Sequence, residues 1–166
     1  MLGARAPGGI AETDTMDSLR ELYQDVILDH HKRPRNRREM PEASAKASGH
    51  NPLCGDRVSV FVKMDGEVLQ DVSFVGSGCA ISQASASMMT DCLKGRTRAD
   101  IDRVATAFQR LVTDEHASMP EGEDLVEKLE AFSGVREFPS RVKCASLAWH
   151  ALRAALEKPG ATVSSE

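Results

Sequence analysis

The run RVSVFVKMDGEVLQDVSF, residues 57–74, is the part of the sequence that decides the fold. Its apolar side chains recur at every second residue over positions 58–64, as they do in a strand that buries one face. Asp65-Gly66 follows, a pair typical of tight hairpin turns, and the alternation resumes at Val72 and Phe74. The run therefore predicts two antiparallel strands joined by a short turn.

Helical periodicity surrounds this hairpin on both sides. Apolar residues spaced three and four apart predict helices over residues 17–31, from Gly78 to Gly95, from Thr97 to Val112, from Leu125 to Gly134 and from Ser140 to Leu156. Thr97 and Ser140 are the predicted N-caps of their helices. One hairpin among several helices indicates the α+β class, and we expect a small antiparallel β-sheet with helices packed on one face.

The two ends of the chain differ in composition from this central part. Residues 1–16 are rich in Gly, Ala and Pro, so we expect a flexible N-terminal tail, with Met16 as a second candidate start. Residues 158–166 are expected to form a flexible C-terminal tail. The remainder, residues 17–157, has the length of a single domain.

The composition excludes several classes of function. The chain carries 21 basic and 25 acidic residues, so its net charge of −4 gives no general attraction for nucleic acid or anionic membranes. No apolar run is long enough to span a bilayer, and the N-terminus has no apolar block typical of a secretory signal. We therefore expect a cytoplasmic protein that binds neither nucleic acid nor membrane, in which the four cysteines are thiols or metal ligands.

Four residues at the boundaries of the predicted elements form a candidate metal site. Cys54 and Asp56 flank Gly55 in the loop before the hairpin, and Gly55 permits a backbone turn that directs both side chains to one ion. Cys79 and Cys144 each lie near the start of a predicted helix, where the positive helix end stabilises a thiolate. Three thiolates and one carboxylate are a suitable tetrahedral shell for zinc.

Other interpretations of these residues remain open. Small cysteines often fill a core, which is how we interpret Cys92 on the apolar face of its helix. Arg141 lies three residues before Cys144, so it can offer a guanidinium to Asp56 or to a displaced thiolate. His50, four residues before Cys54, either acts near the metal or only fills the loop.

A dense group of basic residues occupies positions 32–38. It can form a solvated helix end or a surface for an acidic patch of a partner. A nucleic-acid site is disfavoured, because no aromatic residues interleave with the charges and the net charge is negative.

The combination of motifs resembles the SufU-type members of the NifU-like and IscU-like family of iron–sulfur cluster assembly proteins. The resemblance runs from about Leu19 to Leu156. Its motifs are LYQDVILDH at 22–30 with KRPRN at 32–36, NPLCGD at 51–56, GCAIS at 78–82 and RVKCA at 141–145. Scaffolds of the IscU type have a His before the last Cys, where this chain has Lys143, and the segment from about 112 to 134 resembles the extra segment of SufU-type proteins.

The resemblance implies a NifU/IscU-like fold and a zinc-dependent sulfurtransferase. A SufS-type pyridoxal-phosphate cysteine desulfurase would form a persulfide and pass its terminal sulfur to Cys54, for delivery to downstream cluster-assembly proteins. Zinc would hold Cys54 as a masked thiolate until an exchange of ligands frees it, while Asp56, Cys79 and Cys144 retain the metal and Arg141 stabilises the released thiolate. The alternatives are a scaffold that carries a transient [2Fe–2S] cluster on the same ligands, and a purely structural zinc site.

Overall fold

The predicted hairpin is the centre of a four-stranded sheet in the computed structural model, which describes residues 8–158, 160 and 162–164, the first twelve of them by backbone alone. The strands are β1 (Ala45–Asn51), β2 (Asp56–Asp65), β3 (Val68–Ser77) and β4 (Thr162–Ser164), and their order across the sheet is β3-β2-β1-β4. Neighbouring pairs among the three long strands are antiparallel, as predicted, whereas β4 pairs in parallel with β1 and makes the sheet mixed.

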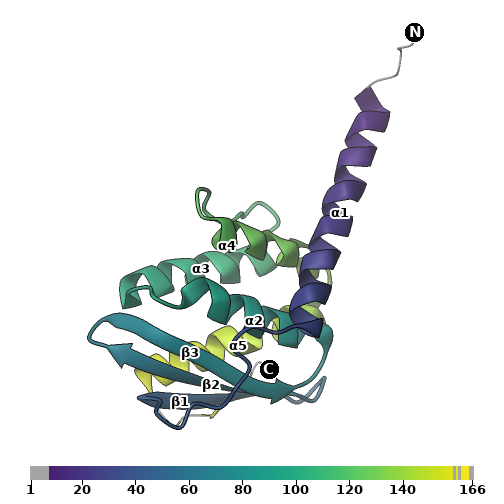
Figure 1. Ribbon diagram of the computed structural model, residues 1–166. Helices are drawn as coiled ribbons and strands as arrows, with labels where there is room; N and C mark the ends of the chain where they lie inside the picture. The colour runs from purple at the N-terminus through teal and green to yellow at the C-terminus, as the bar shows by residue number, and fades with distance from the viewer. Residues whose placement is uncertain (1–7, 159, 161, 165–166) are drawn as a thin grey trace.

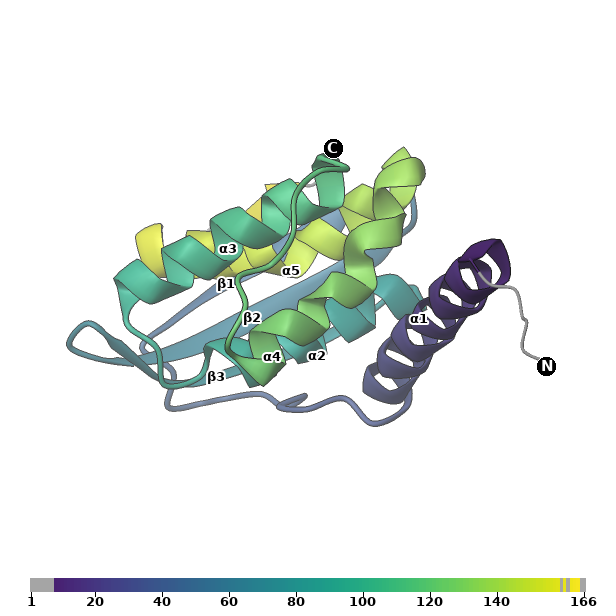
Figure 2. The same ribbon diagram turned by 90° about the horizontal axis from the view of Figure 1, so that it is seen from above.

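The helices lie on one face of this sheet (Figure 1). They are α1 (Gly8–Lys32), α2 (Ala80–Leu93), α3 (Arg98–Thr113), α4 (Asp124–Glu127), the 3₁₀ helix η2 (Lys128–Glu137) and α5 (Pro139–Glu157). Seen from above, α3 runs alongside α5 (Figure 2). The order of elements confirms the α+β class. In the described part of the chain, every helix is too short or too polar to cross a lipid bilayer.

The core lies between the sheet and the helices. The inward positions of β2, Val58, Val60 and Val62, are at most 2% exposed. Above them, the Phe108 ring of α3 stacks on Trp149 of α5 at 4.4 Å between centroids and meets Phe132 of η2 edge-on at 5.6 Å. These rings join α3, η2 and α5, and the burial of their apolar surface stabilises the domain.

Helix α2 is buried on nearly all sides, and not on one face as its sequence pattern predicts. The hydroxyls of Ser85, Ser87 and Thr90 form hydrogen bonds inside the protein, which is how a Ser-rich helix can occupy the centre of a core. Ser87 Oγ accepts from the backbone N–H of Arg35 at 2.8 Å and lies 2.7 Å from His30 Nδ1. His30, in the last turn of α1, is therefore a buried anchor of this helix, and burial lowers the pKa of its imidazole.

Ser85 gives the first testable prediction. Its hydroxyl donates to the carbonyl of Ala145 at 2.6 Å and accepts from Trp149 Nε1 at 3.0 Å, so Ser85→Ala removes two buried hydrogen bonds and leaves the indole N–H of Trp149 without this partner. We expect urea denaturation to show a loss of about 1–3 kcal/mol in the free energy of unfolding. Ser73→Ala is the matched control: within the described residues the Ser73 hydroxyl is buried without a hydrogen-bond partner, so its removal should be nearly neutral. Equal losses of unfolding free energy in the two variants would contradict the stabilising role of the Ser85 hydrogen bonds.

The boundaries of three helices correct the sequence predictions. Helix α1 begins at Gly8 and not at residue 17, because no proline interrupts the backbone between Gly8 and Lys32; residues 1–7 of the predicted tail lie outside the described part. Helix α5 is capped at Phe138 and not at Ser140, since the fixed φ of Pro139 suits the first helical position. The short predicted helix also extends beyond Gly134, as η2 ends at Glu137.

Two strands were absent from the sequence prediction. Strand β1 precedes the hairpin, and β4 arises within the predicted C-terminal tail, of which residues 159, 161, 165 and 166 lie outside the described part. The two strands pair with each other: residues 162–164 of β4 lie beside Ser48, Gly49 and His50 of β1. Strand β4 therefore lies next to the end of β1, from which the loop that carries Cys54 begins.

Arginines of the basic group at positions 32–38 form contacts within the protein itself. Arg35 pairs with Asp29 at 2.7 Å, Arg38 pairs with Asp71 of β3, and Arg37 donates to the carbonyl of Gly76 at 2.7 Å. The contacts of Arg37 and Arg38 bind the connection between α1 and β1 to β3, an outer strand of the sheet.

Candidate metal centre

Three of the four predicted ligands converge at one end of the sheet. One donor atom from each of Cys54, Asp56 and Cys144 lies within 4.8 Å of the others. Cys54 comes from the loop between β1 and β2, Asp56 begins β2, and Cys144 reaches in from α5. The Cys54 side chain is exposed, whereas Asp56 and Cys144 are buried.

The fourth predicted ligand, Cys79, adjoins this group through Asp56. Its Sγ lies 3.8 Å from Asp56 Oδ2, and its backbone N–H donates to Asp56 Oδ1 at 2.9 Å. Cys79 is the N-cap of α2 and its sulfur accepts from the backbone N–H of Ser82 at 3.4 Å. The predicted position of Cys79 at the N-terminal end of a helix is confirmed.

Two glycines permit this convergence. Gly55, between Cys54 and Asp56, has φ of +73°, a left-handed conformation that other residues rarely adopt. Gly78 has φ of +147°, and a Cβ added there would lie 2.2 Å from Asp56 Oδ1. Only a residue without a side chain allows the α2 N-terminus to approach the Asp56 carboxylate so closely.

The chemistry of the donors fits a bound cation. The side chain of Asp56 is fully buried, and among the described residues no Lys, Arg or His forms an ion pair with it. Buried charges are paired or coordinate metals. Two thiolates in a tetrahedral zinc shell lie about 3.8 Å apart, as follows from Zn–S bonds of about 2.3 Å. The Cys54 and Cys144 sulfurs lie 3.6 Å apart, so the residues present fit zinc.

Cys144 reaches the site differently from the prediction. Because α5 begins at Pro139, Cys144 lies in the second turn of the helix and not at its N-terminal end. Burial, followed by the proximity of Asp56 and Cys54, raises the pKa of the Cys144 thiol. A cation at the centre would reverse this effect, because metal binding favours the thiolate.

Asn51 was not identified from the sequence and lies in the centre of the site. Its side chain is fully buried, and Nδ2 lies 3.5 Å from Asp56 Oδ2 and 3.6 Å from Cys144 Sγ. An Asn directly before a Pro is a signal for a turn, and it was available in the sequence. Nothing in the spacing of the cysteines indicates that its amide faces the ligands.

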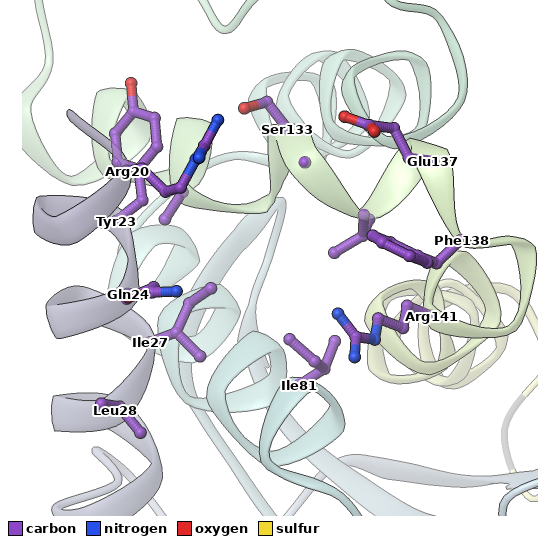
Figure 3. A pocket seen from close by; sticks show the side chains of 13 residues that line it. Arg20, Tyr23, Gln24, Ile27, Leu28, Ile81, Ser133, Glu137, Phe138 and Arg141 are labelled. Atoms are coloured by element: carbon purple, nitrogen blue, oxygen red, sulfur yellow. The ribbon is translucent and has the colours of Figure 1, made fainter. Parts of the chain in front are cut away.

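Arg141 lies beside a groove and forms no ion pair with Asp56 in the described part of the chain. Its guanidinium carbon is 4.6 Å from the centroid of the Phe138 ring. Figure 3 shows both side chains, with Ile81 of α2 nearby, in the wall of a groove of about 890 Å³ whose opposite wall is α1. The role of Arg141 toward a released thiolate stays a prediction.

The other two candidates lie apart from the cluster. His50 pairs with Arg57 across β1 and β2, and alternate residues of a strand point to opposite faces, so His50 lines a shallow groove while Asn51 faces the ligands. Cys92 is 3% exposed in the core, as predicted, and burial raises the pKa of its thiol to about 11. Cys92 is therefore an inert thiol at neutral pH.

Comparison with known proteins identifies the family. Residues 22–162 match the model of the NifU-like N terminal domain. The chain is 40% identical over 146 residues to the zinc-dependent sulfurtransferase SufU of Bacillus subtilis (strain 168), covering 85% of this chain and 93% of the relative. It is 38% identical over 143 residues to the iron-sulfur cluster assembly scaffold protein IscU of Streptococcus pyogenes serotype M1, covering 86% and 87%.

Solved structures give the same result. A nitrogen-fixing NifU-like protein (N-terminal) from Brucella abortus superposes with a TM-score of 0.74 at 27% identity, over 83% of this chain and 94% of that one. The SufU protein of Fervidobacterium islandicum AW-1, a candidate iron–sulfur cluster assembly scaffold for the SUF system, has a TM-score of 0.71 at 30% identity, over 80% and 94%. The chain belongs to the NifU-like N-terminal domain family.

Proposed function

We propose that this chain is a zinc-dependent sulfurtransferase of iron–sulfur cluster assembly that accepts sulfur on Cys54. The observation that carries the proposal is that Cys54 alone among the four predicted ligands is both exposed and placed on a loop. Cys54 and Cys79 are exposed, whereas Asp56 and Cys144 are buried and anchored in β2 and α5. Of the two exposed cysteines, Cys79 is held at the N-cap of α2 by the Ser82 N–H, and Cys54 lies on a loop. Cys54 can therefore turn outward to a partner without disturbing Asp56 and Cys144.

The sulfur transfer needs no oxidant or reductant. The Cys54 thiolate attacks the terminal sulfur of a persulfide on the partner, and a new S–S bond forms with the Cys54 electron pair. The old S–S bond breaks, and its electrons leave with the partner cysteine as a thiolate. Cys54, Asp56, Cys79 and Cys144 are the residues that would hold zinc, and the bound ion would favour the thiolate form of the three sulfurs at neutral pH.

The partner is a pyridoxal-phosphate cysteine desulfurase of the SufS type, because the incoming sulfur must already be at the persulfide level. Arg141 belongs to this account as the cation that stabilises the released thiolate. To do so, the Arg141 guanidinium would have to leave the Phe138 ring. Arg141 and Cys144 lie in the same helix, α5. Downstream cluster-assembly proteins receive the sulfur.

Metal analysis separates this function from its main alternative, a scaffold for a transient [2Fe–2S] cluster. The likeness to a relative named as a scaffold favours that alternative, whereas a carboxylate among the ligands disfavours a stable cluster, which thiolates commonly hold. We expect the chain purified without added metal to contain about one equivalent of zinc. Iron and sulfide in place of zinc, with transfer of an intact cluster to an apo-acceptor, would overturn the sulfurtransferase assignment.

A further inference from the structure

The side-chain amide of Asn51 is held in one orientation by the loop that follows it. Its Oδ1 accepts from the backbone N–H of Leu53 at 3.2 Å, and the backbone N–H of Gly55 donates to the Asn51 carbonyl at 2.8 Å. Because the Leu53 N–H can only donate, Oδ1 must face it. The Nδ2 group therefore faces Asp56 and Cys144, and its N–H bonds are available to both ligands.

Hydrogen-bond donors are distributed unevenly over the four ligands. Asp56 accepts from the Cys79 backbone N–H, and Cys79 accepts from that of Ser82. Cys144 faces Asn51 Nδ2. In the part of the chain that the structure describes, the contact of the Cys54 sulfur is with the Cys144 sulfur, and no N–H group donates to Cys54.

From this distribution we infer that Asn51 is a positioning residue that holds Asp56 and Cys144 as retaining ligands and leaves Cys54 as the reactive one. An N–H donor withdraws charge from the thiolate that accepts it and fixes its direction. Cys54 lacks such a donor, so it keeps the more nucleophilic sulfur and the freedom to move. The inference rests on the proposed zinc site and explains why one of three thiolates is the acceptor.

Two substitutions distinguish this role from a role in the loop alone. Asn51→Asp keeps an oxygen for the Leu53 N–H but removes the N–H donors and places an acceptor against Asp56 and Cys144. Asn51→Ala removes both the oxygen that accepts from Leu53 and the N–H donors that face Asp56 and Cys144. Outer-shell substitutions typically weaken metal binding about 10- to 100-fold, and we expect zinc affinity to fall by that range in Asn51→Ala and further in Asn51→Asp.

Chelator competition on the full chain measures these affinities, and cobalt(II) substitution provides a second readout. In Asn51→Asp the thiolate-to-cobalt absorption per bound ion should lose the contribution of one thiolate, which a change of the loop alone would not cause. Asn36→Asp is the matched control, because it removes an amide that donates to Thr90 Oγ1 at 3.1 Å and leaves the metal site untouched. Its zinc affinity and cobalt spectrum should equal those of the parent chain.

The possible results separate clearly. If Asn51→Asp bound zinc about as tightly as the parent chain, only the side-chain oxygen that accepts from Leu53 would matter, and the inference would be overturned. Parent-like zinc affinity in both variants would overturn it as well. The proposed function is tested independently by the parent chain: an unmodified chain that bound no zinc would refute that function and this inference together. Parent zinc binding with unaffected variants would refute the inference alone.

Discussion

Cys54→Ser should abolish sulfur acceptance by this chain. We expect the rate of sulfur transfer from a cysteine desulfurase to fall at least about 100-fold, because a serine hydroxyl is a far weaker nucleophile and cannot carry a persulfide. The fold should be retained, since Cys54 is exposed on a loop. Desulfurase turnover with cysteine, measured with and without the variant, gives the comparison.

Cys92→Ala is the matched control for this substitution. It also removes one thiol, but from a core position that is 3% exposed and lies in α2 away from the ligand cluster. The loss of one small buried side chain should lower the stability by about 1 kcal/mol and leave sulfur transfer unchanged. If Cys54→Ser only lowered stability and kept the parent rate, the zinc site would be purely structural.

Gly78→Ala should destroy the metal centre without changing any ligand. The added Cβ would lie 2.2 Å from Asp56 Oδ1 and 3.0 Å from Asp56 Cα, so the carboxylate and the start of α2 must separate. The backbone is also strained, because φ of +147° is unfavourable for a residue with a side chain. We expect the zinc affinity to fall at least about 100-fold and the free energy of unfolding to fall by about 1–3 kcal/mol.

Gly134→Ala provides the comparison for Gly78→Ala. A Cβ added at Gly134 meets no atom within 4 Å, and the φ of this residue is not positive. Chelator competition and urea denaturation should find its zinc affinity and stability close to those of the parent chain. Parent-like zinc binding in Gly78→Ala would show that the close approach of Asp56 and α2 is not needed for the site.

The sequence allowed the hairpin to be predicted because its side chains alternate, and it did not reveal β1 for a physical reason. The inward positions of β1 are small: Ala47 and Gly49 replace the branched residues that mark a strand. A Cβ on Gly49 would lie 2.9 Å from Leu147 Cδ1, so the close packing of α5 demands a small residue there. A strand whose inward residues must be small to pack against a helix shows little alternation of large apolar and polar residues in its sequence.

Strand β4 and the start of α5 show a similar dependence on tertiary structure. Three residues of β4 pair in parallel with β1, and such a short edge strand has no local sequence signal. At α5, Pro139 determined the start of the helix and Ser140 did not serve as the cap. That difference places Cys144 deeper in the helix, where burial and not the helix end dominates its pKa.

The sequence predicted the positions of some residues of the site better than those of others. Cys54, Asp56 and Cys79 lie where the element boundaries predicted them, because Gly55 and the junction before α2 are local features. Asn51 could not be assigned in this way. Its importance comes from two contacts, one of them with Cys144 on a helix that lies 93 residues further along the chain.

Mapping the site of sulfur addition by mass spectrometry is the most direct test of sulfur delivery through Cys54. The zinc-loaded chain is incubated with a SufS-type desulfurase and cysteine, alkylated, digested and analysed peptide by peptide. One additional sulfur on Cys54, and none on Cys79, Cys92 or Cys144, is the result that this account predicts. A zinc-loaded chain that gains no sulfur on Cys54 while the desulfurase carries its persulfide would contradict it.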